Sequence, residues 1–300
     1  MKKTLIVLMM VLLAAMLITS CDNKAKELKT INITYDLGGG KLAEGETNPA
    51  TVTEGDTVTL TAPAKEATTE SGVKYSINDY LYCDTADVTT TYTFKGWKVE
   101  GTEDSTAAAT YTAGTEDVKL VAVWEVKATG SNCSATKLKD TVAVGTEITL
   151  GYYYDALKWK VLAVDKNSKK ALLLASEVVS QSMKNNSSES DNFTYAWGSN
   201  SPIYQWFNNT GSDGFISQCR LKDVSMVDSS AGKVFLLSKE EVETNLPNAS
   251  ERICSCWWWL RTGGTNSNVC LVVNPTSGSI FDAIKANTGS GVRPAFWISL

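Results

Sequence analysis

The 300-residue chain contains no histidine. This absence excludes the Ser-His-Asp triad, the Cys-His dyad and the zinc sites that use histidine, because each needs an imidazole ring. No two cysteines have the Cys-x-x-Cys spacing. No carboxylate pair is placed for acid–base chemistry, since Asp36, Glu54 and Asp56 are expected in turns or on the surface. We therefore expect no catalytic residues and no enzymatic activity.

Clusters of lysine and arginine are also absent after the first residues, and the formal net charge is −5. Nucleic-acid binding needs clustered cationic side chains to contact the phosphates, so nucleic acid is excluded as the expected partner. A calcium site needs several converging oxygen ligands, and the sequence does not provide such a set. It therefore predicts no bound metal and no cofactor.

The chain has only one long apolar run, from Leu5 to Ile18. The run has the length of a signal-peptide core and is too short for a comfortable membrane span. It ends in Ile18-Thr19-Ser20-Cys21, which resembles a bacterial lipobox. The resemblance implies a lipoprotein signal peptide over residues 1–20, followed by lipidation of Cys21. An ordinary secretory signal with a chance cysteine is the alternative.

Lipidation would anchor the chain to a membrane durably, because several acyl chains would be attached to one residue. Residues 21–29 are polar and without periodicity, and they are expected to form a short tether. The rest of the chain is expected outside the cytoplasmic membrane, on its periplasmic face or at the cell surface. An exported setting permits disulfides. The six remaining cysteines are Cys83, Cys133, Cys219, Cys254, Cys256 and Cys270.

The disulfide pairing stays open at the level of sequence. Cys254 and Cys256 would point the same way on a strand, and a bridge between them would be strained. One of them could instead pair with Cys270 or Cys219.

The segment 30–127 alternates apolar and polar residues and is rich in threonine, which favours strands. Strands are predicted at 31–37, 92–99 and 118–124, and a β segment with a turn at 54–56 is predicted at 51–60. The motifs ITYDLGGG, YTFKGW and VKLVAVW in these strands resemble the internalin B-repeat, also called the Listeria–Bacteroides repeat. The resemblance implies a small β-grasp-like domain that serves as a spacer or adhesive module on bacterial surfaces. The segment 66–91 is longer than in that family and is expected to form a loop or an extra hairpin. Trp97 and Trp124 are expected to fill the small core, with a ligand platform as the alternative.

The second module, 130–300, opens with two apolar runs, 158–164 and 170–176, on either side of a polar turn. These runs predict a hairpin buried on both faces. Ser201 and Pro202 predict the start of a short helix with Ile203, Trp206 and Phe207 on one face. A capping box at 238–241 predicts a helix that ends near Pro247. Further strands are expected at 233–237, 256–260, 269–273 and 291–298, the second pairing with the third.

Six ordered motifs in this module resemble an uncharacterised bacterial extracytoplasmic domain. They are WKVL at 159–162, ALLL at 171–174, QWF at 205–207, KVFLLS at 233–238, WWLR at 258–261 and GVRPAFWI at 291–298. Members of that family resemble, distantly, the C-type-lectin fold of formylglycine-generating-enzyme-like proteins. The resemblance implies an α+β class for the chain: a small β-grasp-like domain followed by an α+β C-type-lectin-like domain. Fold alone does not give function.

The stretch CSCWWWLRTGG at 254–264 carries most of the functional hypothesis. Alternation along a strand puts Trp258 on one side and Trp257 and Trp259 on the other, and at least one side should be core. We expect Trp258 or Trp259 to anchor the fold and Trp257 to be exposed, where it could contact a sugar or a protein. Arg293 and Arg261 are expected to hold loops through hydrogen bonds to carboxylates or carbonyls. Trp297, in the last strand, is expected to be structural.

The hypothesis is a lipid-anchored binding, adhesion or display module for a glycan or protein ligand. Its face would combine Trp257, the turn at 262–268 and an Asn-rich loop at 185–192, which is expected to be mobile. The candidate ligand-binding residues are Trp257, Arg261, Thr262, Asn266 and Asn268. One alternative is a thiol- or copper-dependent enzyme that uses Cys254 and Cys256. Another is a structural envelope protein without a specific ligand.

Overall fold

The computed structural model describes residues 27–102 and 107–300, which divide into two compact units. Unit 1 combines the residues up to Ala67 with Thr91–Lys127, and unit 2 combines Thr68–Thr90 with Ala128–Leu300. The segment 68–90, assigned above to the first module, therefore belongs to unit 2. The predicted signal peptide, Cys21 and most of the tether lie outside the described residues.

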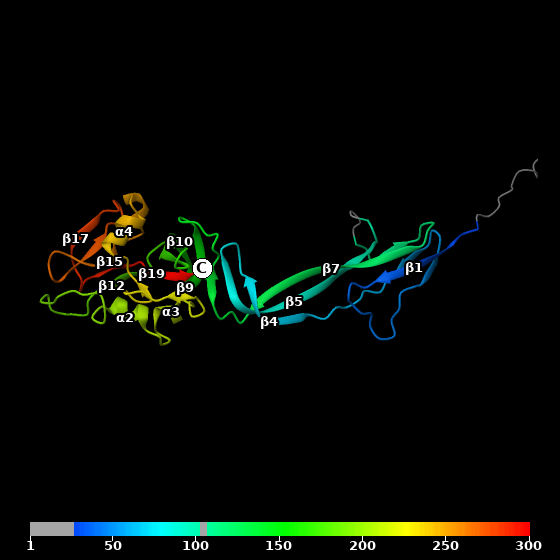
Figure 1. Cartoon of the computed structure of the whole chain (residues 1–300), viewed down its shortest axis with the longest axis horizontal. Coiled ribbons are helices and arrows are strands. Elements are labelled where there is room, and N and C mark those ends of the chain that lie inside the picture. Colours follow the sequence, from blue (N-terminus) through cyan, green and yellow to red (C-terminus); the bar gives the residue numbers. More distant parts are fainter. Residues whose placement is uncertain (1–26, 103–106) are drawn as a thin grey trace, which may run out of the picture. The chain divides into compact units, whose positions relative to one another are not determined.

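Strands dominate the described part of the chain, as Figure 1 shows. They hold 46% of its residues, and helices hold 8%. The expected α+β class is therefore wrong, and the protein has a β-rich fold. The reason lies in helix length. The α+β class came from the family resemblance, whereas the two helices that the residues predicted, a short one starting at Pro202 and one ending near Pro247, are each only 7 residues long and add little to the strand content. No helix in the described part of the chain has the length and apolar character needed to cross a membrane.

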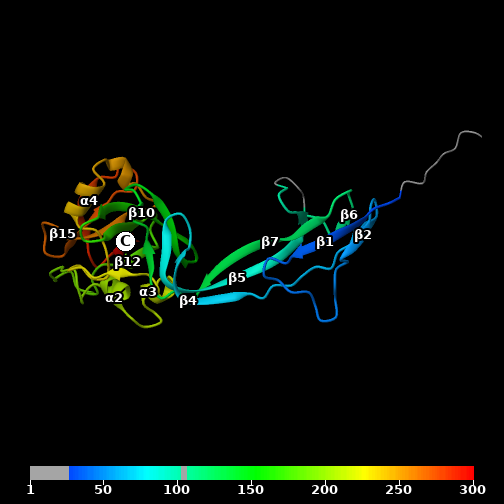
Figure 2. The same cartoon turned by 45° about the vertical axis from the view of Figure 1, so that its right-hand side comes forward.

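Unit 1 is built on four strands in the order β2-β1-β7-β5 (Figure 2). Their bounds are β1 Thr30–Asp36, β2 Thr51–Thr53, β5 Leu81–Val99 and β7 Val118–Ser131. β1 runs antiparallel to β2 and parallel to β7. A second, two-stranded sheet joins β3 (Thr57–Thr59) to β6 (Thr110–Thr112). The β segment predicted at 51–60, with a turn at 54–56, is present as β2 and β3 on either side of that turn, and the two strands lie in different sheets.

The tryptophans of unit 1 serve its core. Trp97 is buried and packs edge-on against Tyr35 and Phe94, with ring centroids 5.4 and 5.6 Å away. The preceding Gly96 has φ +130°, and a Cβ there would lie 2.7 Å from the backbone of residues 107 and 108. Trp124 is half-buried, and its indole N–H donates to the Leu37 carbonyl at 3.1 Å. Packing therefore explains the Gly96-Trp97 pair.

Unit 2 begins with a hairpin of β4 (Thr68–Ser76) and the first half of β5, so the expected extra hairpin is present. β8 (Thr136–Leu138) pairs with the same part of β5. A disulfide joins Cys83 to Cys133, 50 positions apart, with 5.8 Å between their Cα atoms. The hairpin is therefore tied to the following chain by a ladder and a covalent bond.

Two larger sheets form the body of unit 2. The first has the order β13-β19-β11-β10-β9, with β14 also paired to β19, and the second has the order β12-β18-β15-β16-β17. The strands of the first are β9 Glu147–Tyr153, β10 Asp155–Asp165, β11 Lys170–Ala175, β13 Met226–Val227, β14 Val234–Phe235 and β19 Ala295–Ser299. Those of the second are β12 Ser180–Lys184, β15 Trp258–Gly263, β16 Val269–Val273, β17 Ile280–Lys285 and β18 Gly289–Val292. The short helices are α2 Pro202–Asn208, α3 Phe215–Gln218, α4 Lys239–Asn245 and the 3-10 turn η1 Ala249–Arg252.

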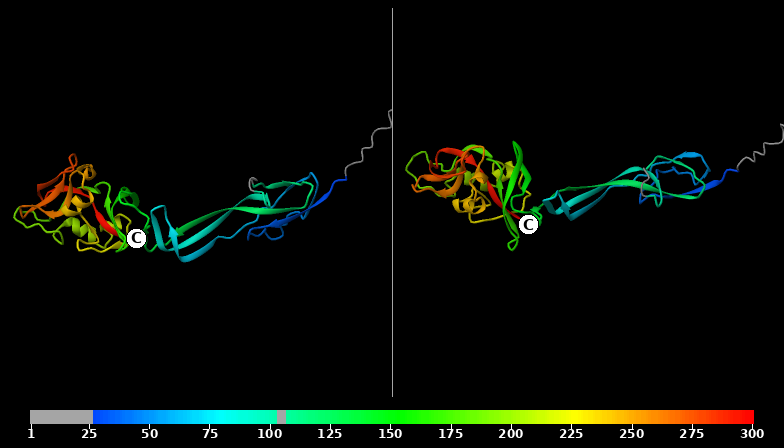
Figure 3. Two further views of the ribbon diagram at one scale, coloured as in Figure 1. Left: turned by 45° about the horizontal axis from the view of Figure 1, so that its top comes forward. Right: turned by 90° about the horizontal axis from the view of Figure 1, so that it is seen from above.

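The central strands of the two large sheets of unit 2 are buried on both faces. Along β11, Leu173 belongs to one core while Leu172 and Leu174 belong to another. Helices α2 and α3 contribute to the first core and α4 to the second. Figures 1 and 3 show these helices on different sides of the strands. The predicted hairpin of β10 and β11, buried on both faces, is confirmed.

Local signals located both capped helices correctly. The Ser201 hydroxyl accepts the Tyr204 N–H, and the capping box between Ser238 and Glu241 is present. The single strand predicted at 291–298 is wrong, because it is divided between β18 and β19, which lie in different sheets. The break falls at Pro294, which has no N–H to donate to a ladder.

Candidate functional site

Two of the three consecutive tryptophans are core residues. Trp258 and Trp259 are fully buried, and because they alternate along β15 they lie in opposite cores. Each indole N–H has a partner: Trp258 donates to the Arg252 carbonyl at 3.1 Å, and Trp259 donates to the Met183 carbonyl at 2.8 Å. The two tryptophans therefore hold β15 between the two hydrophobic cores.

Trp257 lies just before β15 and is 37% exposed. Its carbonyl accepts hydrogen bonds from the Gly291 N–H at 2.8 Å and the Ser290 hydroxyl at 3.1 Å. A Cβ on Gly291 would lie 2.4 Å from that carbonyl oxygen, so glycine is needed for this close approach. The backbone of the exposed tryptophan is therefore held in place by β18.

Trp257 makes one aromatic contact, with Phe281 of β17. The rings meet edge to face with centroids 5.4 Å apart, and Phe281 is 43% exposed. We call Trp257 and Phe281 the aromatic platform. A cavity of about 290 Å³ adjoins it, lined by Gln181, Cys256, Trp257, Ile284, Thr288, Gly289 and Ser290. The cavity thus combines apolar surface with one amide and two hydroxyl groups.

The structure assigns Arg261 to the fold. Its guanidinium donates to both carboxylate oxygens of Glu241, one of them at 2.7 Å, and to the Leu236 carbonyl at 2.7 Å. It also lies over the Phe235 ring, 5.3 Å from the centroid. Because Glu241 is the third residue of α4 and closes its capping box, Arg261 joins β15 to that helix. The contacts that the structure shows for Arg261 therefore serve the fold, and Arg261 does not line the cavity beside Trp257.

The turn at 262–268 forms a region separate from the aromatic platform. The Thr262 hydroxyl accepts the Lys239 N–H at 2.9 Å, at the start of α4. Thr262 lines a cavity of about 600 Å³ that does not include Trp257. Asn266 is exposed, and its carbonyl accepts the Val269 N–H at 3.1 Å. The predicted face therefore divides, with Trp257 at one cavity and Thr262 at another.

The turn at 262–268 and the loop at 185–192 do meet, as expected. The Asn268 amide donates to the Asp191 carbonyl at 2.7 Å, and Lys285 forms a 2.5 Å ion pair with the Asp191 carboxylate. The expectation that the whole loop is mobile fails at its start, where Asn185 and Asn186 are buried. The Asn185 amide donates to the Tyr195 hydroxyl and accepts from Ser201. Satisfied buried amides anchor this end of the loop.

The remaining structural candidates lie near the cores. Arg293 is 3% exposed and donates to the carbonyls of Ala175 and Ser176 at 2.7 and 3.2 Å. Its guanidinium lies over the Trp258 ring. Trp297 is half-buried, with the Lys170 ammonium 4.6 Å from its ring centroid. Arg293 thus ties the junction of β18 and β19 to the end of β11.

Four described cysteines are free: Cys219, Cys254, Cys256 and Cys270. The Cys254 thiol donates to the Glu177 carboxylate at 3.1 Å. Burial raises the pKa of Cys254 and of Cys256. Protonated thiols are weak nucleophiles and poor metal ligands. Within residues 27–102 and 107–300, no group of three His, Cys, Asp or Glu side chains could hold a metal ion.

Sequence reasoning missed Phe281, which contacts the Trp257 ring, and Gln181, which lines the cavity beside it. They come from β17 and β12, the two outer strands of the five-stranded sheet, and no local pattern links them to residue 257. No protein-family model, no curated protein and no solved structure matches the chain. The function is therefore argued from the geometry of the chain itself.

Proposed function

We propose that this protein is a lipid-anchored, extracytoplasmic binding module that recognises a glycan at the aromatic platform. The observation that carries the proposal is the pairing of two exposed rings, Trp257 and Phe281, beside a cavity with hydrogen-bonding side chains. Large exposed aromatic rings are costly to leave in water, and they supply contact area at low entropic cost when a ligand covers them.

The chemistry of the cavity suits a sugar. A sugar ring presents an apolar face of C–H groups, which can lie against an indole, and a rim of hydroxyl groups. The Gln181 amide can donate and accept, and the Thr288 hydroxyl, which donates to the Lys285 carbonyl at 2.7 Å, keeps lone pairs to accept. A volume of about 290 Å³ is at the small end for ligand pockets and suits a single ring.

The remaining parts of the chain support display of this site. The lipobox-like sequence ending at Cys21 supports a lipid anchor, and the repeat-like motifs of unit 1 support a spacer or adhesive role. The raised pKa of Cys254 and of Cys256 favours binding over thiol catalysis. These features fit a protein that presents a binding surface outside the cytoplasmic membrane.

The proposal is tested by screening the full-length chain, purified in a nonionic detergent, on an array of glycans and envelope polysaccharides. Trp257→Ala and Phe281→Ala are screened alongside it. Tyr154→Ala is the matched control, because Tyr154 is an aromatic residue of unit 2 that is 86% exposed and does not line this cavity.

A saturable signal that both platform variants lose and the control keeps, with unchanged melting temperatures, supports the proposal. A signal that Trp257→Ala retains contradicts it, because the site would then lie elsewhere. The absence of any saturable glycan signal also contradicts it and turns attention to a protein ligand.

A further inference from the structure

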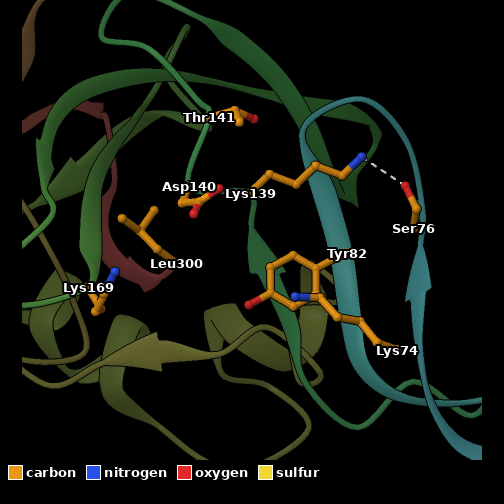
Figure 4. Close-up of a pocket in the computed structure, with 8 residues that line it drawn as sticks. All are labelled: Lys74, Ser76, Tyr82, Lys139, Asp140, Thr141, Lys169 and Leu300. Carbon is orange, nitrogen blue, oxygen red and sulfur yellow. Dashed lines mark hydrogen bonds between the residues drawn. The ribbon is translucent and has the colours of Figure 1, made fainter.

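A second cavity in unit 2, of about 580 Å³, gathers lysines from three separate segments (Figure 4). Lys74 comes from β4, Lys139 follows β8, and Lys169 lies in the turn between β10 and β11. The complete lining is Lys74, Ser76, Tyr82, Lys139, Asp140, Thr141, Lys169 and Leu300. None of these residues lines the cavity beside the aromatic platform.

The side chains of this lining carry three positive charges against the single negative charge of Asp140. Among the described residues, no carboxylate forms an ion pair with any of the three lysines. In a chain of net charge −5, this is a local reversal of sign that attracts anions.

Two of the ammonium groups are held in position. The Lys74 nitrogen lies 3.8 Å from the centroid of the Tyr82 ring, and the Lys139 nitrogen donates to the Ser76 hydroxyl at 2.8 Å. Figure 4 shows the Tyr82 hydroxyl directed toward the middle of the lining residues. A phenolic O–H in that place can donate to an anion.

The frame around the cavity is also fixed. Tyr82 lies opposite Lys137 in the β5–β8 ladder, and the adjacent Cys83 forms the disulfide with Cys133. The Lys139 N–H donates to the Tyr80 carbonyl at 2.8 Å. A site that is ordered before binding loses less entropy when the ligand arrives.

We propose that this cavity is an anion-binding site for a small polar ligand that carries a carboxylate, sulfate or phosphate group. Lysine ammonium groups act as point charges with rotatable donors and bind all three oxyanions without the fixed fork geometry of arginine. The volume leaves room for a ring attached to the anionic group. The inference does not rest on the glycan proposal, because the two cavities share no residue.

The test is calorimetric titration of the full-length chain in nonionic detergent at low ionic strength. The probes are sodium sulfate, pyrophosphate and glucuronate, with glucose as the neutral counterpart of glucuronate. The key variant is K74M/K139M, which removes two charges and keeps most of the side-chain length. K166M/K184M is the matched control, because it removes two exposed lysines of unit 2 that do not line the cavity.

We expect saturable binding of at least one anion, no binding of glucose, and weakening by added salt. K74M/K139M should lower the affinity by at least about tenfold, because each close charge contributes strongly in a partly enclosed site. K166M/K184M and Trp257→Ala should retain it. Preference among sulfate, pyrophosphate and glucuronate then identifies the anionic group.

Three results would overturn the inference. The first is that no anion binds saturably at low salt. The second is that K74M/K139M, with an unchanged melting temperature, binds as well as the original chain. The third is that both double variants lose affinity equally, since binding would then follow net charge and not this cavity.

Discussion

Adjacent tryptophans in the segment 257–262 serve different purposes. Trp258 and Trp259 have both faces of their strand covered, and Arg261 is bound to α4 through Glu241. Trp257, one position earlier, keeps part of its ring exposed, and its ring contacts that of Phe281. The difference follows from strand pairing, because β15 and its neighbours begin to bury side chains at residue 258. Residue type alone does not separate an anchor from a binding surface.

The largest expected effect on stability comes from the buried tryptophans. Trp259→Ala should destabilise the protein by about 3–5 kcal/mol, because it removes a large buried ring and leaves a cavity. Trp257→Ala should cost less than about 1 kcal/mol, since its ring is already partly in water. Chemical denaturation of both variants, followed by circular dichroism, measures the difference. Equal losses of unfolding free energy would contradict the distinction between the buried Trp259 and the exposed Trp257.

An intermediate effect is expected at Arg261. Arg261→Met should cost about 1–3 kcal/mol, because it leaves the Glu241 carboxylate and the Leu236 carbonyl without a charged donor. Glycan affinity at the aromatic platform should stay within about twofold of the original, because the guanidinium does not line that cavity. Denaturation and glycan titration on the same sample check this. A large loss of glycan affinity with unchanged stability would contradict this and would place Arg261 in the binding site.

Helix starts and strand patterns were predictable from sequence because their causes are local. Ser201 with Pro202, and Ser238 with Glu241, begin helices by bonding their own first turns. The fold class did not follow from these local signals, because it was taken from the family resemblance, whereas the observed class depends on how the many strand segments pair across the chain. The cavity lined by lysines could not be predicted either. Lys74, Lys139 and Lys169 are far apart in the sequence, so they form no basic cluster along the chain.

The smallest effect concerns the thiols next to the platform. Because burial raises the pKa of Cys254 and of Cys256, their thiolate fractions at pH 7 are lower than that of a free cysteine. Alkylation by iodoacetamide should therefore be slow near neutral pH and accelerate only in alkaline solution. The raised pKa values also stabilise the fold at lower pH, and this contribution is lost as pH rises above the ordinary thiol value. Rapid labelling of either residue at pH 7, mapped by mass spectrometry, would favour thiol chemistry.

The most direct test of the central claim is the affinity of the array-selected glycan for three proteins: the original chain, Trp257→Phe and Trp257→Ala. The account predicts partial retention by Trp257→Phe, a loss of at least about tenfold for Trp257→Ala, and little change in stability, since a single aromatic anchor dominates such sites. Equal affinities for all three proteins would contradict the account, because the exposed tryptophan would then make no contact with the ligand.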